Sequence, residues 1–135
     1  MERTISVLND VKDLSELLEG ASVDQARLAP SSGRLQLELD LTRACPELET
    51  VVRRGFSTRT KTPWVKSRLT LSQVKGASVQ HLTDVSPTQS PLLSCEAIPG
   101  GYALVVTGHD GLRLSLTLEQ LNGQFADVGK PVESP

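Results

Sequence analysis

The chain has 135 residues, 38% apolar and 22% charged, with a formal net charge of −2 at pH 7. This length and composition are typical of one globular domain, and the scarcity of aromatic residues implies a core of leucine, valine and alanine. The start, MERTISVLND, lacks the basic flank and apolar run of a signal peptide, and no stretch approaches the roughly 18 apolar residues of a membrane span. We therefore expect a single domain over residues 1–130, a flexible tail over 131–135, a cytoplasmic location and no membrane partner.

Residues 9–20, NDVKDLSELLEG, have the pattern of a short amphipathic helix. Asn9 or Asp10 is a suitable N-cap, and Gly20 is a suitable stop. The apolar residues fall on one helical face: Val11, Leu14, Leu17 and Leu18.

Residues 35–42 alternate strictly between leucine and polar residues. A period of two places every leucine on one face of a strand, whereas a helix would scatter them around its axis. The turn-forming residues 30–33, PSSG, then predict a hairpin that pairs this strand with residues 22–28.

Residues 46–54 have the end signals of a second short helix, with proline and acidic residues first, basic residues last and glycine as a stop: Pro46, Glu47, Glu49, Arg53, Arg54 and Gly55. This pattern gives Arg53 and Arg54 a structural task at the helix C-terminus. We therefore do not expect these two residues to bind a ligand.

Residues 64–74 alternate around Leu69 and Leu71 and predict a strand that continues beyond Gly76 to residue 82. The segment 83–91, TDVSPTQSP, then has the composition of a loop.

The last third of the chain predicts three strands joined by two short turns. The strands are LLSCEAI, YALVVT and LRLSLTL, and residues 119–125 add a last turn or strand. YALVVT is apolar on both faces, which favours a central position. The expected fold is mainly β, an antiparallel barrel or two-layer sandwich of about seven short strands with two short helices.

Few residues in this sequence carry catalytic chemistry. His81 and His109 are expected at a strand end and in a turn, and Cys45 and Cys95 as buried or half-buried thiols. Glu38 and Asp40 fit the solvent face of a strand better than a catalytic pair. No nucleotide-binding, metal-binding or nucleophile motif occurs, so we expect a protein that is not an enzyme and has no cofactor or metal.

Residues 53–75 hold seven of the fourteen basic residues and no acidic residue, which leaves the rest of the chain with seven basic and sixteen acidic residues, a balance of −9. Two hypotheses follow from this segment. The first is a module that binds a protein partner or itself, anchored by Phe56, Arg59 and Trp64, residue types that dominate interface energies. Trp64 also fits a place in the core.

The alternative is binding of single-stranded nucleic acid through residues 53–75. Aromatic residues would stack on bases and basic residues would contact phosphates, and the residues concerned are Phe56, Arg59, Lys61, Trp64, Lys66, Arg68 and Lys75. The acidic remainder of the chain and the pI of about 5.7 weigh against this alternative.

Overall fold

The computed structural model describes residues 2–31, 33–45, 50–55, 57–81, 92–107 and 112–132. Within these residues it contains one helix, α1 (Leu8–Leu17), and ten strands. The strands in chain order are β1 (Glu2–Ile5), β2 (Ser22–Ser31), β3 (Arg34–Ala44), β4 (Thr50–Arg54), β5 (Ser57–Lys61), β6 (Trp64–His81), β7 (Leu93–Ile98), β8 (Gly101–Thr107), β9 (Leu112–Leu118) and β10 (Gly123–Asp127).

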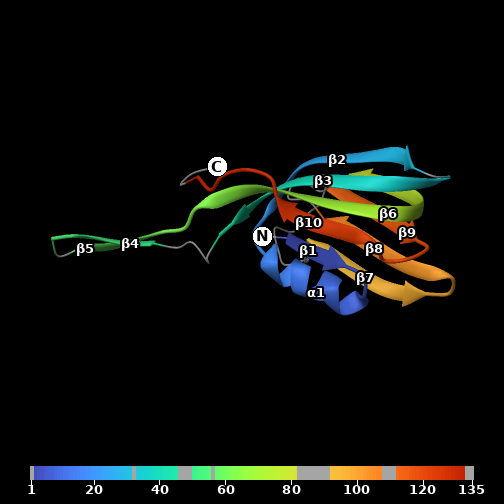
Figure 1. Cartoon of the computed structure of the whole chain (residues 1–135), viewed down its shortest axis with the longest axis horizontal. Coiled ribbons are helices and arrows are strands. Elements are labelled where there is room, and N and C mark those ends of the chain that lie inside the picture. The colour runs from blue at the N-terminus through green and yellow to red at the C-terminus, as the bar shows by residue number, and fades with distance from the viewer. Residues whose placement is uncertain are drawn as a thin grey trace.

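Eight of these strands form one antiparallel sheet that curls into a half-barrel with α1 against it (Figure 1). The 18-residue strand β6 is its centre: β3 pairs along one edge, and β10 and β9 pair in turn along the other. β1 extends the sheet from β10, β8 and β7 extend it from β9, and β2 extends it from β3. We call this sheet together with α1 the body.

The mainly β fold class is confirmed, and so is the expected strand of residues 35–42. Leu37, Leu39 and Leu41 in β3 have no exposed surface, while Glu38 and Asp40 between them are half-buried on the opposite face. The pairing of β2 with β3 confirms the predicted hairpin. YALVVT lies in β8 between β7 and β9, which confirms its internal position.

Helix α1 begins at Leu8, slightly before the predicted start, and Val7 is its N-cap. Asp10 still caps this end, because its Oδ2 accepts hydrogen bonds from the backbone N–H groups of Ser6 at 2.9 Å and Val7 at 3.1 Å. These bonds lower the pKa of Asp10. The opposite face of α1 joins the core through Val11 and Leu14.

The core is built mainly from leucine, as the composition predicts. Its fully buried side chains include Leu14, Leu18, Leu37, Leu39, Leu41, Leu69, Leu104, Leu118, Val74, Val106 and Phe125. Tyr102 is half-buried and packs against this cluster.

The prediction of a second helix over residues 46–54 is wrong for the part of this segment that the structure describes. Residues 50–54 form strand β4, and residues 46–49 lie outside the described part of the chain. Thr50, Val51 and Val52 are β-branched residues, which favour extended backbone, and this preference outweighs the capping pattern around them. The expected loop 83–91 and the turn that contains His109 also lie outside the described residues.

Two short strands were not predicted in full. β1 has only four residues and no complete alternation, and β10 makes the expected last segment a strand that pairs with both β1 and β6. The described part of the chain has no helix with the length and hydropathy needed to span a membrane.

Candidate functional site

Strands β4 and β5 form a separate two-stranded sheet that projects away from the body (Figure 1). Their register runs from Thr50 opposite Lys61 to Arg54 opposite Ser57. We call residues 50–61 the arm. Each strand of the arm has five residues and is therefore roughly 16 Å long, taking the rise of a strand.

The sequence at the tip explains the hairpin. Gly55 and Phe56 separate the two strands, and Gly55 has a φ of +60°. A positive φ at the first central position is what two-residue hairpin turns require, and glycine adopts it without steric cost. The glycine that suggested a helix stop is therefore a hairpin turn residue.

The arm concentrates positive charge. It contains Arg53, Arg54, Arg59 and Lys61 and no acidic residue. Arg53 and Arg54 end β4 beside the turn, so the helix-terminus task predicted for them is wrong and they are candidates for binding. Phe56, a predicted anchor, lies outside the described residues.

Three segments meet at the base of the arm. Trp64 is opposite Ala44 at the end of the β3–β6 ladder, and the Cys45 N–H donates to the Pro63 carbonyl at 2.8 Å. The Trp64 N–H donates to the Val132 carbonyl at 2.6 Å, and the Val132 N–H donates back to the Trp64 carbonyl at 2.7 Å. Val132, within the expected tail 131–135, thus pairs with β6.

Trp64 itself is half-buried at this base. It alternates with Val65 and Ser67, which are buried, so it lies on the same face of β6 as the exposed Lys66 and Arg68. The sequence allows Trp64 either an exposed place as a binding anchor or a place in the core. In the structure it lies neither in the main core nor on a fully exposed surface.

Below the arm, Arg43 occupies an inward position of β3 and is only 1% exposed. It forms a two-point ion pair with Asp127, and Ser67 Oγ donates to the same carboxylate at 2.7 Å. Burial by itself raises the pKa of Asp127, but the hydrogen bonds from Arg43 and Ser67 outweigh burial and lower it.

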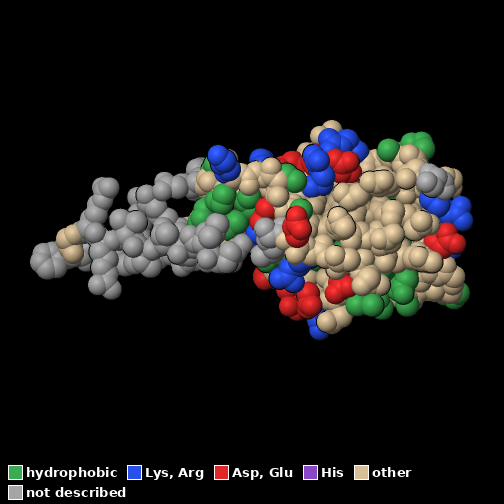
Figure 2. Space-filling model, viewed as in Figure 1, with side chains coloured by type: hydrophobic (Ala, Val, Ile, Leu, Met, Phe, Trp, Pro, Cys, Tyr) green, Lys and Arg blue, Asp and Glu red, His purple; other side chains and the backbone are tan. Residues whose placement is uncertain are grey.

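Lys66 and Arg68, two predicted binding residues, are neutralised by carboxylates of neighbouring strands. Lys66 Nζ lies 3.0 Å from Asp24 Oδ2, and Arg68 Nε lies 2.9 Å from both Glu38 Oε1 and Asp40 Oδ1. Figure 2 shows basic and acidic side chains adjoining over β2 and β3.

With Arg27, which also binds Glu38 and Asp40, this network has three cations and three anions and no net charge: Asp24, Arg27, Glu38, Asp40, Lys66 and Arg68. The pKa of Asp40 is lowered, first by the hydrogen bond from Arg68. Burial tends to raise the pKa of Asp24, but bonds from Thr42 and Lys66 outweigh it and the pKa falls. Glu38 and Asp40 therefore hold the sheet surface together, as the solvent-face interpretation expected.

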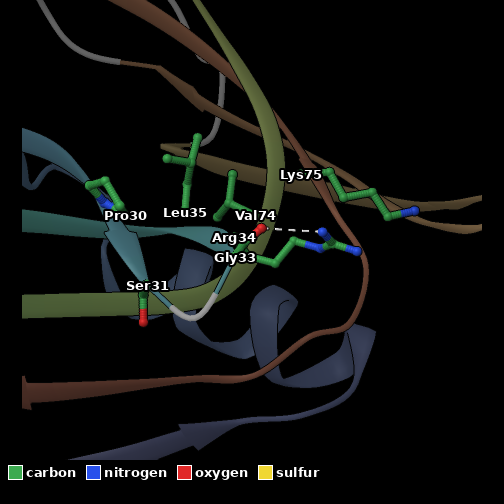
Figure 3. Close-up of a pocket in the computed structure, with 7 residues that line it drawn as sticks. All are labelled: Pro30, Ser31, Gly33, Arg34, Leu35, Val74 and Lys75. Carbon is green, nitrogen blue, oxygen red and sulfur yellow. Dashed lines mark hydrogen bonds between the residues drawn. The ribbon is translucent and has the colours of Figure 1, made fainter.

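Lys75 lies far along β6 from the arm, where its Nζ donates to the Gly100 carbonyl at 2.9 Å. It lines a hollow of about 600 Å³ formed by Pro30, Ser31, Gly33, Arg34, Leu35, Val74 and Lys75 (Figure 3). The Arg34 and Lys75 side chains extend away from the apolar group, and Arg34 Nε is paired with Glu119 at 3.0 Å. The hollow thus lacks a set of converging polar groups.

The structure therefore separates the six predicted binding residues that it describes; the seventh, Phe56, lies outside the described residues. Arg59 and Lys61 are in the arm, Trp64 is at its base, Lys66 and Arg68 belong to the neutral network, and Lys75 is at the other end of β6. Among the described residues, no group of three or more His, Cys, Asp or Glu side chains is placed to hold a metal ion. Cys45 is a buried cysteine and Cys95 a half-buried one.

Sequence reasoning missed two features of this region. The arm had a usable signal in its β-branched residues on both sides of Gly55. The sequence held no signal for the buried position of Arg43, because its partner Asp127 is 84 residues away in the sequence.

Comparison of this chain with protein-family models, with curated proteins and with solved structures finds no match. The geometry of the arm and of the body therefore carries the functional argument.

Proposed function

We propose that this chain is a non-catalytic binding module that recognises a protein partner through the arm. The observation that carries the proposal is the separation of the arm from the body: among the strands that the structure describes, β4 and β5 pair only with each other, in a sheet of their own. A two-stranded hairpin without further packing is marginally stable in water. Contact with a partner supplies the packing that such a hairpin otherwise lacks.

The charges of the body also support the arm as the binding element. Lys66 and Arg68, the first two basic residues after the arm in β6, are matched by carboxylates, whereas the arm has four basic residues and no acidic one. Unbalanced charge steers a partner of opposite sign during encounter and selects against partners of like sign. The partner surface that fits the arm is therefore acidic.

Single-stranded nucleic acid is the second candidate partner. It is favoured by the same four basic residues, which phosphates would neutralise, and by the aromatic Phe56 between them in the sequence. The pairing of Lys66 and Arg68 with carboxylates removes them from any phosphate track that continues from the arm. The residues that could bind nucleic acid are therefore those of the arm alone.

The test compares two charge variants with the native chain. The arm variant is Arg53→Glu with Arg59→Glu, and the matched control is Arg113→Glu with Lys130→Glu, two exposed positions on the body. Each protein is immobilised, incubated with a nuclease-treated lysate and cross-linked, and a labelled 20-nucleotide strand is titrated separately at low and moderate salt.

We expect the native chain and the control to cross-link the same protein and the arm variant to lose it. If the native chain, the control and the arm variant all cross-link the same protein equally, the proposal is contradicted. Salt-sensitive binding of the oligonucleotide, lost only in the arm variant, would instead establish the nucleic-acid candidate.

A further inference from the structure

The acidic side chains of the body fall into two groups. On the sheet, Asp24, Glu38, Asp40, Glu119 and Asp127 are each within 3.0 Å of a basic group. Along β1, α1 and β7, five exposed acidic residues have no ion pair within the described part of the chain: Glu2, Asp13, Glu16, Glu19 and Glu96. We call β1, α1 and β7 the acidic flank.

The three elements of the acidic flank are held together. α1 packs along β7, with Ser15 Oγ donating to the Leu93 carbonyl at 2.9 Å, and it also contacts β1. Figure 2 shows acidic side chains over α1 at the lower edge of the body, with basic side chains beside them. Counting residues 2–20 and 93–98, the flank has six acidic and two basic residues, a balance of −4, whereas the arm has a balance of +4.

The flank also offers apolar surface. Val7 is 53% exposed and Leu8 is 38% exposed, and both lie where α1 begins. An interface needs apolar contact beside its charges, because exposed ion pairs by themselves contribute little affinity. The start of α1 therefore combines negative charge with apolar side chains that the described residues of this copy leave uncovered.

We infer that the arm of one copy binds the acidic flank of a second copy, an inference that rests on the arm being the binding element. The arm extends away from the body, so within one copy the two oppositely charged surfaces remain apart (Figure 1). Two copies that exchange arms satisfy both surfaces and form a closed dimer, and successive copies joined head to tail also satisfy both. In either arrangement the chain assembles with itself through complementary charge.

A charge exchange tests this contact directly. The arm variant Arg53→Glu with Arg59→Glu lowers the charge balance of the arm from +4 to 0 and leaves the acidic flank intact. The flank variant Glu16→Lys with Glu19→Lys raises the charge balance of the flank from −4 to 0 and leaves the arm intact. It is compatible with folding because lysine is favourable at a helix C-terminus. Circular dichroism and cooperative melting establish that each variant is folded, and Asp13→Lys with Glu96→Lys serves as a second flank variant.

Sedimentation velocity at about 50 mM NaCl then measures assembly. We expect the native chain to self-associate and each variant alone to associate at least tenfold more weakly. An equimolar mixture of arm and flank variants should regain association, because the intact arm of the flank variant meets the intact flank of the arm variant. The control Arg113→Glu with Lys130→Glu should behave as the native chain. Raising NaCl to about 0.5 M should weaken native assembly about tenfold or more, because salt screens exposed charges.

A native chain that stays monomeric, or a mixture of variants that does not reassemble, would overturn the inference. If the native chain is monomeric while the arm still determines which protein is cross-linked from a lysate, the proposed function stands and only the identity of the partner is wrong. If the arm variant changes neither the self-association measured by sedimentation nor the protein that is cross-linked from a lysate, both proposals fail.

Discussion

The Arg43 guanidinium and the Asp127 carboxylate form a two-point ion pair at the base of the arm, with Nε 3.1 Å from Oδ1 and Nη2 2.8 Å from Oδ2. Arg43 continues the inward-facing row that Leu39 and Leu41 begin in β3, so a charge occupies a position of the hydrophobic series. Ser67 of β6 binds the same carboxylate. The ends of β3, β6 and β10 are thereby tied together where the arm leaves the body.

Replacing Asp127 by asparagine should destabilise the fold by about 3 kcal/mol, because a buried guanidinium loses its counter-charge. Urea unfolding followed by Trp64 fluorescence measures this change. Arg43→Met with Asp127→Asn removes the stranded charge as well, and it should recover about 1 kcal/mol or more of the loss. The Arg34–Glu119 pair is the control: it is exposed, so Glu119→Gln should cost less than about 1 kcal/mol. A loss for Asp127→Asn no larger than that of the control would contradict a stabilising role for the pair.

The stability of the body should fall in acid. The pKa values of Asp24, Asp40 and Asp127 are lowered in the folded state, so the unfolded chain binds protons first as the pH falls. The stabilisation from these groups is complete above the unfolded carboxyl pKa of about 3.9 and is lost as the pH falls through the folded values. We expect an unfolding midpoint that changes little from pH 7 to pH 5 and then drops, and a shallower drop in Asp127→Asn. An unfolding midpoint that rises as the pH falls below 4 would contradict this prediction.

The parts of the fold that the sequence predicts are those with local periodicity. Leu37, Leu39 and Leu41 alternate with polar residues, and this pattern alone places them on one buried face. The arm was misassigned because Pro46, Glu47 and Gly55 resemble helix ends while the β-branched residues between them favour a strand. Local signals of similar strength conflicted there, and tertiary context decided the outcome.

The binding surface was harder to predict because charge neutralisation depends on contacts between distant residues. Lys66 is separated from Asp24 by 42 residues and Arg68 from Asp40 by 28. Arg68 meets Asp40 across adjacent strands, and Lys66 reaches Asp24 across the intervening β3. A sequence lacking acidic residues over 53–75 therefore looked like one basic surface. The sheet register divides it into a neutral face and a basic arm.

Gly101→Ala should destabilise the fold by about 2 kcal/mol or more, because a Cβ at this position would overlap the backbone carbonyl of Leu118 in the adjoining β9. Gly76→Ala is the matched control: it also lies in a strand of the sheet, and nothing lies within 4 Å of an added Cβ there. That substitution should change stability by less than about 1 kcal/mol, since it mainly restricts the unfolded chain. Thermal melting compares the two variants, and equal shifts would show that the close approach of β8 to β9 relaxes readily.

Removing the arm should leave the body folded. Cys45 and Pro63 are joined by a backbone hydrogen bond of 2.8 Å at the end of the β3–β6 ladder, so a two-residue Asn-Gly turn in place of residues 46–62 can close this hairpin. Every core residue that the structure describes lies outside residues 46–62, and so do Trp64 and Val132, which pair at the base. We expect cooperative melting with an unfolding free energy within about 1 kcal/mol of the native value, and a Trp64 emission spectrum that keeps its position. Loss of cooperative melting would mean that residues 46–62 are part of the folded body, whereas a folded armless protein that no longer binds its partner would separate the binding role of the arm from any role in stability.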